Sequence, residues 1–232
     1  MAKTLGILGG LGPMAGAYFY QLVTALTAAD CDQDHLRVVL TGFADTPDRT
    51  AYILDPTRPD PTPQMIEAAQ TLEKMGAQIL AMPCNTAHYF YDAVANSVRV
   101  PMLNIIEETL RLLCEKGAKK IGLLATAGTI FAGTYPMRAE KYGLVCEVPT
   151  AAEQTVVNEI IYGQIKQGKT PDIARFEKVA NSLFARGCTH LVLGCTELSL
   201  LGQTFHLDER YVDSLYALAR ATVLACGATL RT

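Results

Sequence analysis

The sequence lacks the features that would place the protein in a membrane or on a nucleic acid. Its first apolar run, Leu5 to Leu8, is far shorter than a signal peptide requires, and no later run reaches the length of a membrane span. The formal net charge is only −3, so the chain has no basic excess to attract a polyanion. We therefore expect a cytoplasmic protein that binds neither membrane nor nucleic acid.

Closely spaced cysteine pairs are also missing. The seven cysteines are an odd number and none of them forms a CxxC spacing, which argues against a disulfide framework and a zinc ribbon. The chain does not need such crosslinks, because 232 residues, half of them apolar, bury enough surface to fold without them. Stability therefore does not depend on the cysteines.

The sequence does contain a regular alternation of short β-type apolar runs with helical patterns, which predicts parallel sheet covered by helices. The expected strands are Leu5 to Leu8, Val38 to Thr41, Ile79 to Met82, Ile121 to Ala125, Val145 to Val148 and Leu191 to Leu193. The expected helices are Ala15 to Ala28, Pro63 to Lys74, Ile105 to Glu115, Glu153 to Lys166, Ile173 to Ala185 and Tyr211 to Ala225.

The two halves of the chain echo each other. Gly6 lies in one expected strand and Gly12 follows it by six residues, and Gly122 and Gly128 repeat this arrangement in the second half. Ordered repeats of this kind indicate two lobes of one architecture. We expect an α/β protein with two pseudosymmetric lobes, each a mostly parallel sheet flanked by helices. Lobe one would comprise residues 1–100 together with 206–232, and lobe two residues 101–205.

Two cysteines take part in the same repeat. Gly76 precedes a strand and then Cys84 by eight residues, and Gly187 precedes a strand and then Cys195 by the same eight. In parallel α/β sheets, the loops at the carboxyl ends of the strands form the ligand crevice. Both thiols are expected there, at helix starts whose N–H groups and dipole favour the thiolate. The expected active site is the cleft between the lobes, where the two thiols approach a ligand from opposite sides.

This matched placement separates the two cysteines from the other five. A single cysteine is commonly a small buried core residue, and that remains the alternative interpretation of Cys84 and Cys195. The remaining cysteines have no comparable setting, and we assign them to packing or to the surface. They are Cys31, Cys114, Cys146, Cys188 and Cys226.

The glycine-rich loop after the first expected strand has three interpretations. Gly9 to Ala15 nearly fits the dinucleotide fingerprint, but the acidic residue that should end the second strand is missing. Backbone N–H groups of such a loop also bind a simple carboxylate, which makes Gly10, Leu11 and Gly12 candidate substrate-binding residues. A tight strand-to-helix turn accounts for the glycines in every case.

Two cations and one histidine are further candidates. Arg49 follows the second strand at the carboxyl edge, where a guanidinium group can grip a carboxylate, and Lys166 lies near a helix end. Both could equally be solvated surface charges. His88 is four residues from Cys84, so it could ligate zinc with Cys84 and Cys195 or form a Cys–His nucleophile pair. Packing is the simpler interpretation of His88, and we expect no metal.

Five segments together resemble those of the aspartate/glutamate racemase family, whose members use two cysteines and no cofactor. They are Gly6 to Pro13, Pro47 to Thr50, Pro83 to His88, Gly122 to Thr126 and Gly194 to Leu198. Each segment is short, but the ordered set is specific and extends over nearly the whole chain. The resemblance implies two α/β lobes with the site between them, no cofactor, and a homodimer.

By this resemblance Cys84 and Cys195 carry over as the catalytic acid and base at the α-carbon of an amino acid. Arg49 and Lys166 match the cations that the aspartate-type branch associates with the distal carboxylate. Asn85, Thr86 and Thr196 are similar to the hydrogen-bonding partners of the α-carboxylate and amino group. The full set of implied substrate-binding residues is Gly10, Leu11, Gly12, Arg49, Asn85, Thr86, Thr126, Lys166, Thr196 and Glu197.

Departures from relatives narrow the substrate. Glutamate racemases typically carry an Asp-Ser-Gly loop and a Gly-Cys-Thr-His motif, whereas this chain has Gly-Gly-Leu-Gly-Pro and Gly-Cys-Thr-Glu. We therefore expect an aspartate racemase. The alternatives are a glutamate or broad-specificity amino-acid racemase, a maleate isomerase or decarboxylase of the same architecture, and a non-catalytic binder of acidic amino acids. A dithiol redox role is disfavoured, because two sulfurs at disulfide distance leave no room for substrate.

Overall fold

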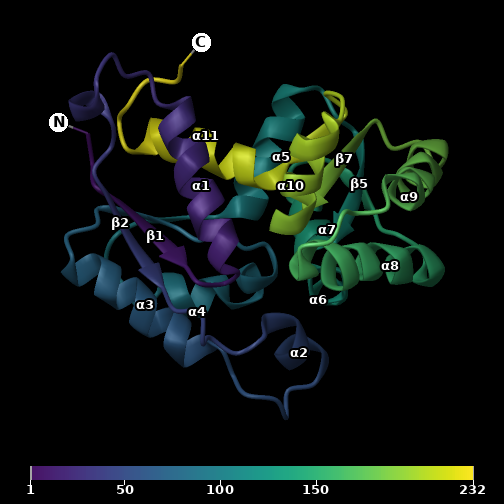
Figure 1. Cartoon of the computed structure of the whole chain (residues 1–232), viewed down its shortest axis with the longest axis horizontal. Helices are drawn as coiled ribbons and strands as arrows, with labels where there is room; N and C mark the ends of the chain where they lie inside the picture. Colours follow the sequence, from purple (N-terminus) through teal and green to yellow (C-terminus); the bar gives the residue numbers. More distant parts are fainter. Residues whose placement is uncertain (1, 232) are drawn as a thin grey trace.

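The computed structural model describes residues 2–231 and contains two four-stranded parallel sheets (Figure 1). The strand orders are β2-β1-β3-β4 and β6-β5-β7-β8, so the same topology occurs twice. The first sheet consists of β1 (Leu5–Gly9), β2 (Val38–Gly42), β3 (Ile79–Ala81) and β4 (Met102–Leu103). The second consists of β5 (Lys120–Ala125), β6 (Val145–Glu147), β7 (His190–Gly194) and β8 (Tyr211–Asp213). The predicted α/β class and the six predicted strands are confirmed.

Helices cover both sheets. The α-helices are α1 (Pro13–Leu26), α2 (Arg49–Leu54), α3 (Thr62–Lys74), α4 (Tyr91–Ala95), α5 (Ile105–Glu115), α6 (Ala127–Ala132), α7 (Thr134–Lys141), α8 (Ala151–Asn158), α9 (Ile173–Ala185), α10 (Thr196–Phe205) and α11 (Ser214–Ala225). Four tighter or wider helical segments are η1 (Asp32–Asp34), η2 (Thr86–Phe90), η3 (Glu159–Gln164) and η4 (Ile165–Gln167). Within residues 2–231, none of these helices combines the length and apolar character that a membrane span requires.

The glycine echo in the sequence has a packing cause. Gly6 pairs in register with Leu80, and Gly122 pairs with Leu191. A Cβ atom at either glycine would lie 2.5 Å from the Cδ2 atom of that leucine. Any side chain would therefore separate the central strands from their covering helices α3 and α9. Both halves need glycine at the same point of the same topology.

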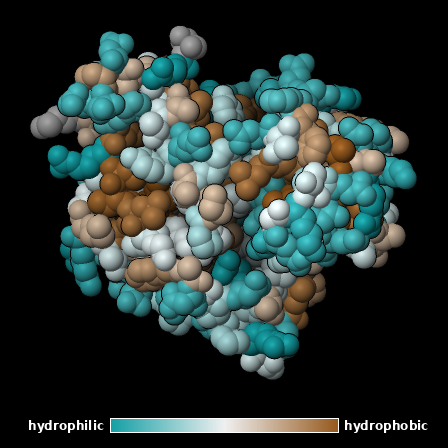
Figure 2. All heavy atoms as spheres, viewed as in Figure 1, coloured by the Kyte–Doolittle hydropathy of each residue, from teal (hydrophilic) through white to brown (hydrophobic). Residues whose placement is uncertain are grey.

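The two lobes share one hydrophobic core. Helix α11 packs against both α1 and α5 between the sheets, where Phe19, Leu110 and Leu218 are fully buried. Figure 1 shows α11 crossing beside α1 and α5. Two smaller clusters fill the outer sides of the sheets. On the face seen in Figure 2, hydrophilic residues alternate with smaller hydrophobic patches. The shared core joins the lobes and brings the carboxyl edges of their sheets toward a common space.

The prediction that the last helix begins at Tyr211 is wrong. Residues 211–213 form the edge strand β8, and the helix begins at Ser214, where the side chain of Asp213 accepts a hydrogen bond from the Leu215 N–H at 2.8 Å. The two-residue edge strand β4 was also unexpected. Strands this short show no alternation in sequence. Each strand pairs in the other sheet from the one that the expected lobe boundaries imply. Strand β4 lies in the residue range of expected lobe two but joins the first sheet, and β8 lies in that of expected lobe one but joins the second.

The prediction of one continuous helix from Glu153 to Lys166 is also wrong. Helix α8 ends at Asn158, and the chain continues as the π-helix η3 and the 3₁₀-helix η4. A π-helical segment widens the turn and re-aims the side chains after it, and such segments are frequent at functional sites. Here it directs Tyr162 and Lys166 toward the first lobe.

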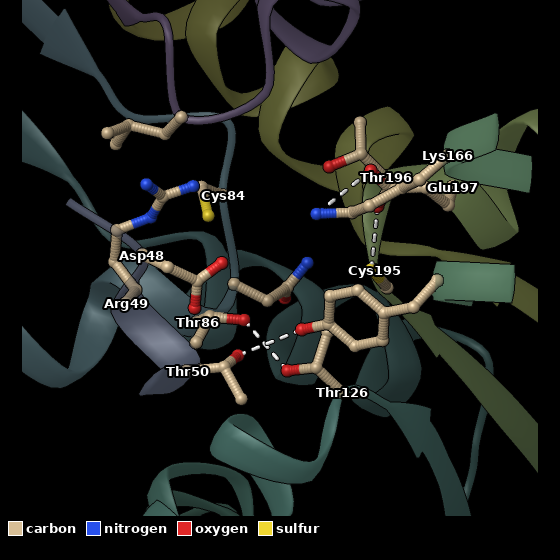
Figure 3. A pocket seen from close by; sticks show the side chains of 13 residues that line it. Asp48, Arg49, Thr50, Cys84, Thr86, Thr126, Lys166, Cys195, Thr196 and Glu197 are labelled. Carbon is tan, nitrogen blue, oxygen red and sulfur yellow. Dashed lines mark hydrogen bonds and ion pairs between the residues drawn. The ribbon is translucent and has the colours of Figure 1, made fainter. Parts of the chain in front are cut away.

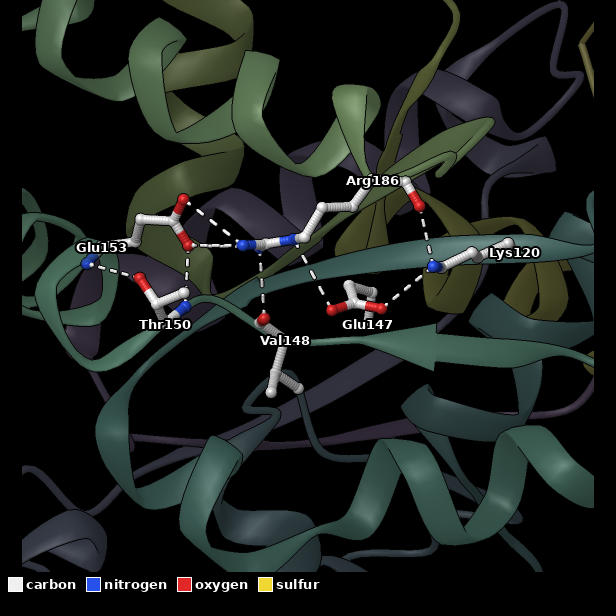
Figure 4. A network of polar contacts seen from close by, with 6 residues as sticks. All are labelled: Lys120, Glu147, Val148, Thr150, Glu153 and Arg186. Atoms are coloured by element: carbon white, nitrogen blue, oxygen red, sulfur yellow. Dashed lines mark hydrogen bonds and ion pairs between the residues drawn. The ribbon is translucent and has the colours of Figure 1, made fainter.

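A polar network anchors the start of α8 (Figure 4). The Arg186 guanidinium group donates to Glu153 Oε2 at 3.1 Å and to the Val148 carbonyl at 3.3 Å. Glu153 also accepts from the N–H of Thr150, whose hydroxyl accepts in turn from the Glu153 N–H. The network ties the start of α8 to β6 and to the end of α9. It therefore holds in place the helix that leads into the segment with Tyr162.

Candidate active site

Cys84 and Cys195 line one small cavity, each just beyond the carboxyl end of a central strand. Both side chains are buried, with 7% of each residue exposed. Figure 3 shows the two sulfurs on different walls, with Arg49 beside Cys84 and Lys166 above Cys195. The other lining residues are Leu11, Asp48, Arg49, Thr50, Asn85, Thr86, Thr126, Tyr162, Lys166, Thr196 and Glu197.

The surroundings of the Cys195 thiol favour its protonated form. Cys195 caps α10, and its Sγ–H donates to Glu197 Oε2 at 2.8 Å. Burial, followed by the negative charge of Glu197, raises the pKa of the Cys195 thiol well above its ordinary value. The backbone N–H of Glu197 at the helix start lowers the pKa of the Cys195 thiol, as predicted, but this effect is smaller than those that raise the pKa. The field of α10 is outweighed by desolvation and by the adjacent carboxylate.

Glu197 connects Cys195 to Lys166. While Glu197 Oε2 accepts from the thiol, Oε1 lies 3.6 Å from Lys166 Nζ. The Lys166 ammonium group also lies 4.9 Å from the centre of the Tyr162 ring, within the range of a cation–π contact. The Cys195 thiol, the Glu197 carboxylate and the Lys166 ammonium group therefore form a chain along one wall of the cavity.

Arg49 supplies a positive charge on the opposite wall. It begins α2, and its Nη1 donates to the carbonyl groups of Thr46 and Pro47 at 3.1 and 2.9 Å. The Nε atom of Arg49 is buried and has no hydrogen-bond partner within residues 2–231. A buried N–H group of a cationic side chain is costly unless it donates to a hydrogen-bond acceptor. This arrangement suits an anionic ligand.

Asn85 is fixed by groups from both lobes. Its Oδ1 accepts from the Tyr135 hydroxyl at 2.6 Å, and its Nδ2 donates to Ser214 Oγ at 2.9 Å. The Ser214 hydroxyl donates onward to the Leu193 carbonyl at 2.8 Å. Only 2% of Asn85 is exposed. The amide therefore has one orientation beside Cys84.

Threonine hydroxyls from both lobes meet below the thiols. Thr86 Oγ1 lies 2.9 Å from the Oγ1 atom of Thr126 and 3.0 Å from that of Thr129. A second contact joins Thr50 Oγ1 to the Tyr162 hydroxyl at 3.0 Å. In Figure 3 these contacts close one side of the cavity. Predicted residues Thr86 and Thr126 thus lie together, with Thr196 on the Cys195 wall.

His88 is a structural residue. Its Nε2 accepts from the Ile105 N–H at 3.0 Å, so the proton lies on Nδ1, which donates to the Cys84 carbonyl at 2.8 Å. Burial lowers the pKa of His88 to about 4. Both ring nitrogens are occupied, and neither contacts the Cys84 thiol. In the part of the chain that the structure describes, no group of three or more His, Cys, Asp or Glu residues is arranged to hold a metal.

Leu11 is the part of the glycine loop that reaches the cavity, and Gly10 and Gly12 do not line it. Gly10 has φ +89°, and a Cβ atom there would lie 2.5 Å from the backbone of Phe43. Gly12, with φ +114°, caps the start of α1. The two glycines shape the turn that presents Leu11.

Three lining residues were absent from the predicted set: Asp48, Thr50 and Tyr162. Asp48 and Thr50 flank Arg49, and Asp48 Oδ1 accepts from the Ala51 N–H at 2.8 Å, which caps α2. Their position next to Arg49 in the same short motif was the signal that could have identified them from the sequence. Tyr162 is four residues before Lys166 on what the sequence predicted as one helix face. That spacing was its only signal, and it is typical of any surface helix.

Comparison with known proteins identifies relatives of the chain in sequence and in fold. A model of the Asp/Glu/Hydantoin racemase family matches residues 8–222. The broad specificity amino-acid racemase RacX of Bacillus subtilis (strain 168) is 29% identical over 230 residues, which cover 94% of this chain and 96% of RacX. The structure of Picrophilus torridus aspartate racemase superposes with a TM-score of 0.85 at 30% identity, covering 99% of this chain and 96% of that one. Glutamate racemase from Francisella tularensis subsp. tularensis SCHU S4, in complex with D-glutamate, shares the fold with a TM-score of 0.70 at 16% identity, covering 97% and 81%.

Proposed function

The chain belongs to the Asp/Glu/Hydantoin racemase family and is an amino-acid racemase, and we propose that it interconverts L- and D-aspartate with Cys84 and Cys195 as acid and base and without a cofactor. The observation that carries this proposal is the convergence of both thiols on one small cavity from equivalent positions of a repeated topology. Racemisation needs a base on one face of the α-carbon and an acid on the other. The paired thiols meet that need.

In the proposed reaction one sulfur, as thiolate, takes the α-proton, and the C–H electron pair moves into an enolate of the α-carboxylate. The other thiol then delivers its proton to the opposite face, so no net oxidation occurs. Cys195 is already a thiol that donates to Glu197. In a turnover that uses the Cys195 thiol as the acid, Cys84 is the base. The reverse reaction exchanges the two roles.

The charges of the cavity support a diacid substrate. Arg49 and Lys166 bring two cations to a small space, and the buried Arg49 Nε has no acceptor within residues 2–231. We assign the distal carboxylate of aspartate to these cations. We assign stabilisation of the charge that develops on the α-carboxylate to hydroxyl and amide groups of cavity-lining residues, namely Asn85, Thr86, Thr126 and Thr196. The similarity to the Picrophilus aspartate racemase points the same way.

The test is to incubate L-aspartate in heavy water and to measure both the D-enantiomer and α-deuteration. We expect Cys84→Ala and Cys195→Ala each to lose racemisation by about 10²- to 10⁴-fold. Cys114→Ala, which changes an exposed cysteine of α5, is the matched control and should retain full activity. Racemisation that survives in both active-site variants would overturn the two-thiol mechanism.

The same experiment separates the rival functions. A binding protein would bind aspartate tightly yet show no exchange at the α-carbon. A maleate isomerase would instead form a covalent adduct between an unsaturated diacid and Cys84 or Cys195, detected by mass spectrometry. Similarity to RacX makes broad specificity the second candidate. Exchange on many amino acids at rates comparable to aspartate would favour it.

A further inference from the structure

A second cavity adjoins the active site. It has a volume of about 270 Å³ and shares Lys166, Thr196 and Glu197 with the active-site cavity. The rest of its wall consists of residues from the start of α1, from Ile165 and from α10: Gly12, Pro13, Met14, Ala15, Ile165 and Leu200. These residues carry no charged group. We call this space the outer cavity.

The partition between the two cavities is the ion pair of Lys166 and Glu197. Glu197 is held in place from the active-site side, because its Oε2 accepts from the Cys195 thiol at 2.8 Å. Lys166 is held more loosely, with its Nζ 3.6 Å from Glu197 Oε1 and 4.9 Å from the centre of the Tyr162 ring, and with its side chain 34% exposed. A partly exposed ion pair with a long lysine side chain contributes little net stability. Lys166 is therefore the partner that can move aside.

We propose that Lys166 is a gate that gives the enzyme a second class of substrate, namely amino acids with unbranched apolar side chains such as methionine. Acidic substrates bind with Lys166 in place, because its ammonium group pairs with their distal carboxylate. An apolar side chain displaces Lys166 and enters the outer cavity beside Met14, Ile165 and Leu200. The inference rests on the proposed racemase function and extends its substrate range.

The geometry keeps the chemistry the same for both classes. Thr196 lines both cavities, so the α-carbon of either substrate remains next to Cys195 while only the side chain changes direction. Gly12 borders the gate, since a Cβ atom there would lie in ordinary contact with Glu197, 4.0 Å from its Oε1. A side chain at this position would narrow the opening on the side facing Glu197.

The first test fills the outer cavity without touching the active-site wall. Leu200→Trp should lower kcat/KM for α-deuteration of L-methionine by about tenfold or more and leave that for L-aspartate unchanged. Leu224→Trp places the same residue on the exposed face of α11, where Leu224 is 48% exposed. It should leave kcat/KM unchanged for both substrates. An equal loss on both substrates in Leu200→Trp would overturn the inference.

The second test removes the gate. Lys166→Met should raise kcat/KM for L-methionine and lower it for L-aspartate, so that the ratio of the two changes by about 10²-fold or more. Exchange on aspartate with none on methionine, in both the wild type and Lys166→Met, would overturn the gate while leaving the aspartate proposal intact. Absence of exchange on every amino acid would overturn the two-thiol proposal and the gate together.

Discussion

The hydroxyl groups of Thr50 and Tyr162 lie 3.0 Å apart, although 112 residues separate them in the chain. Thr50 belongs to α2 of the first lobe, and Tyr162 belongs to the π-helix η3 of the second. Both line the cavity that holds the thiols. Their hydrogen bond therefore ties the lobes together across the edge of the site, and it does so next to Lys166, whose ammonium group lies over the Tyr162 ring.

Removing this hydrogen bond should weaken substrate retention. We expect Tyr162→Phe to raise KM for aspartate by about fivefold, because a hydrogen bond of this kind contributes about 1 kcal/mol. The phenylalanine ring preserves the contact with Lys166, whereas Tyr162→Leu removes both and should have the larger effect. Steady-state racemisation kinetics measure the difference. An unchanged KM in Tyr162→Phe would show that the lobes do not depend on this contact.

The contact of Tyr135 with Asn85 predicts a coupled loss of stability and turnover. Tyr135→Phe leaves the buried Asn85 Oδ1 without its 2.6 Å donor. The free energy of unfolding should fall by about 1–3 kcal/mol, and kcat should fall because the Asn85 amide loses its single orientation. Denaturant unfolding and initial rates provide the two measurements.

Tyr20 supplies the matched control for this prediction. It is 47% exposed, so Tyr20→Phe should alter neither stability nor rate. A Tyr135→Phe variant with lower stability but unchanged kcat would limit Tyr135 to a structural role.

The environment of Cys195 predicts how its thiol responds to loss of Glu197. Glu197→Gln removes a negative charge and a carboxylate acceptor, both of which raise the pKa of the Cys195 thiol. The pKa of this thiol should therefore fall. The rate of Cys195 alkylation by iodoacetamide, followed by mass spectrometry, should reach half its maximum at a lower pH than in the wild type. Glu209→Gln, at an exposed position, should leave the profile unchanged.

The buried histidine predicts an acid-sensitive component of stability. Burial lowers the pKa of His88 from 6.5 to about 4, so the folded state holds the neutral ring while the unfolded state takes up a proton below pH 6.5. The contribution of His88 is complete above that pH and is lost as pH falls toward 4. The loss amounts to about 3 kcal/mol.

Unfolding free energies measured across this pH range test the assignment. His88→Asn should flatten the dependence, because no titrating ring remains. His206→Asn removes an exposed histidine and should keep the wild-type slope. Equal slopes in the wild type and His88→Asn would assign the acid sensitivity to other groups.

Local patterns in the sequence predicted most of the architecture. Apolar runs such as Leu5 to Leu8 and Leu191 to Leu193 mark strands that are buried on both faces, where the pattern is strongest. The edge strand β8 was mistaken for the first turn of a helix, because three residues at a sheet edge carry no periodic signal. The π-helix η3 was missed for a related reason. It follows α8 without a glycine or proline at the junction, and its widened turn depends on tertiary contacts.

The amino-acid sequence by itself determined the duplicated α/β topology and the matched positions of Cys84 and Cys195, because periodicity and spacing are properties of neighbouring residues. Only the tertiary structure decided that the pKa of the Cys195 thiol is raised, that His88 is committed to backbone groups, and that Tyr162 borders the site. Burial and charge at these positions come from segments far apart in the chain. Their effect exists only once the two sheets face each other.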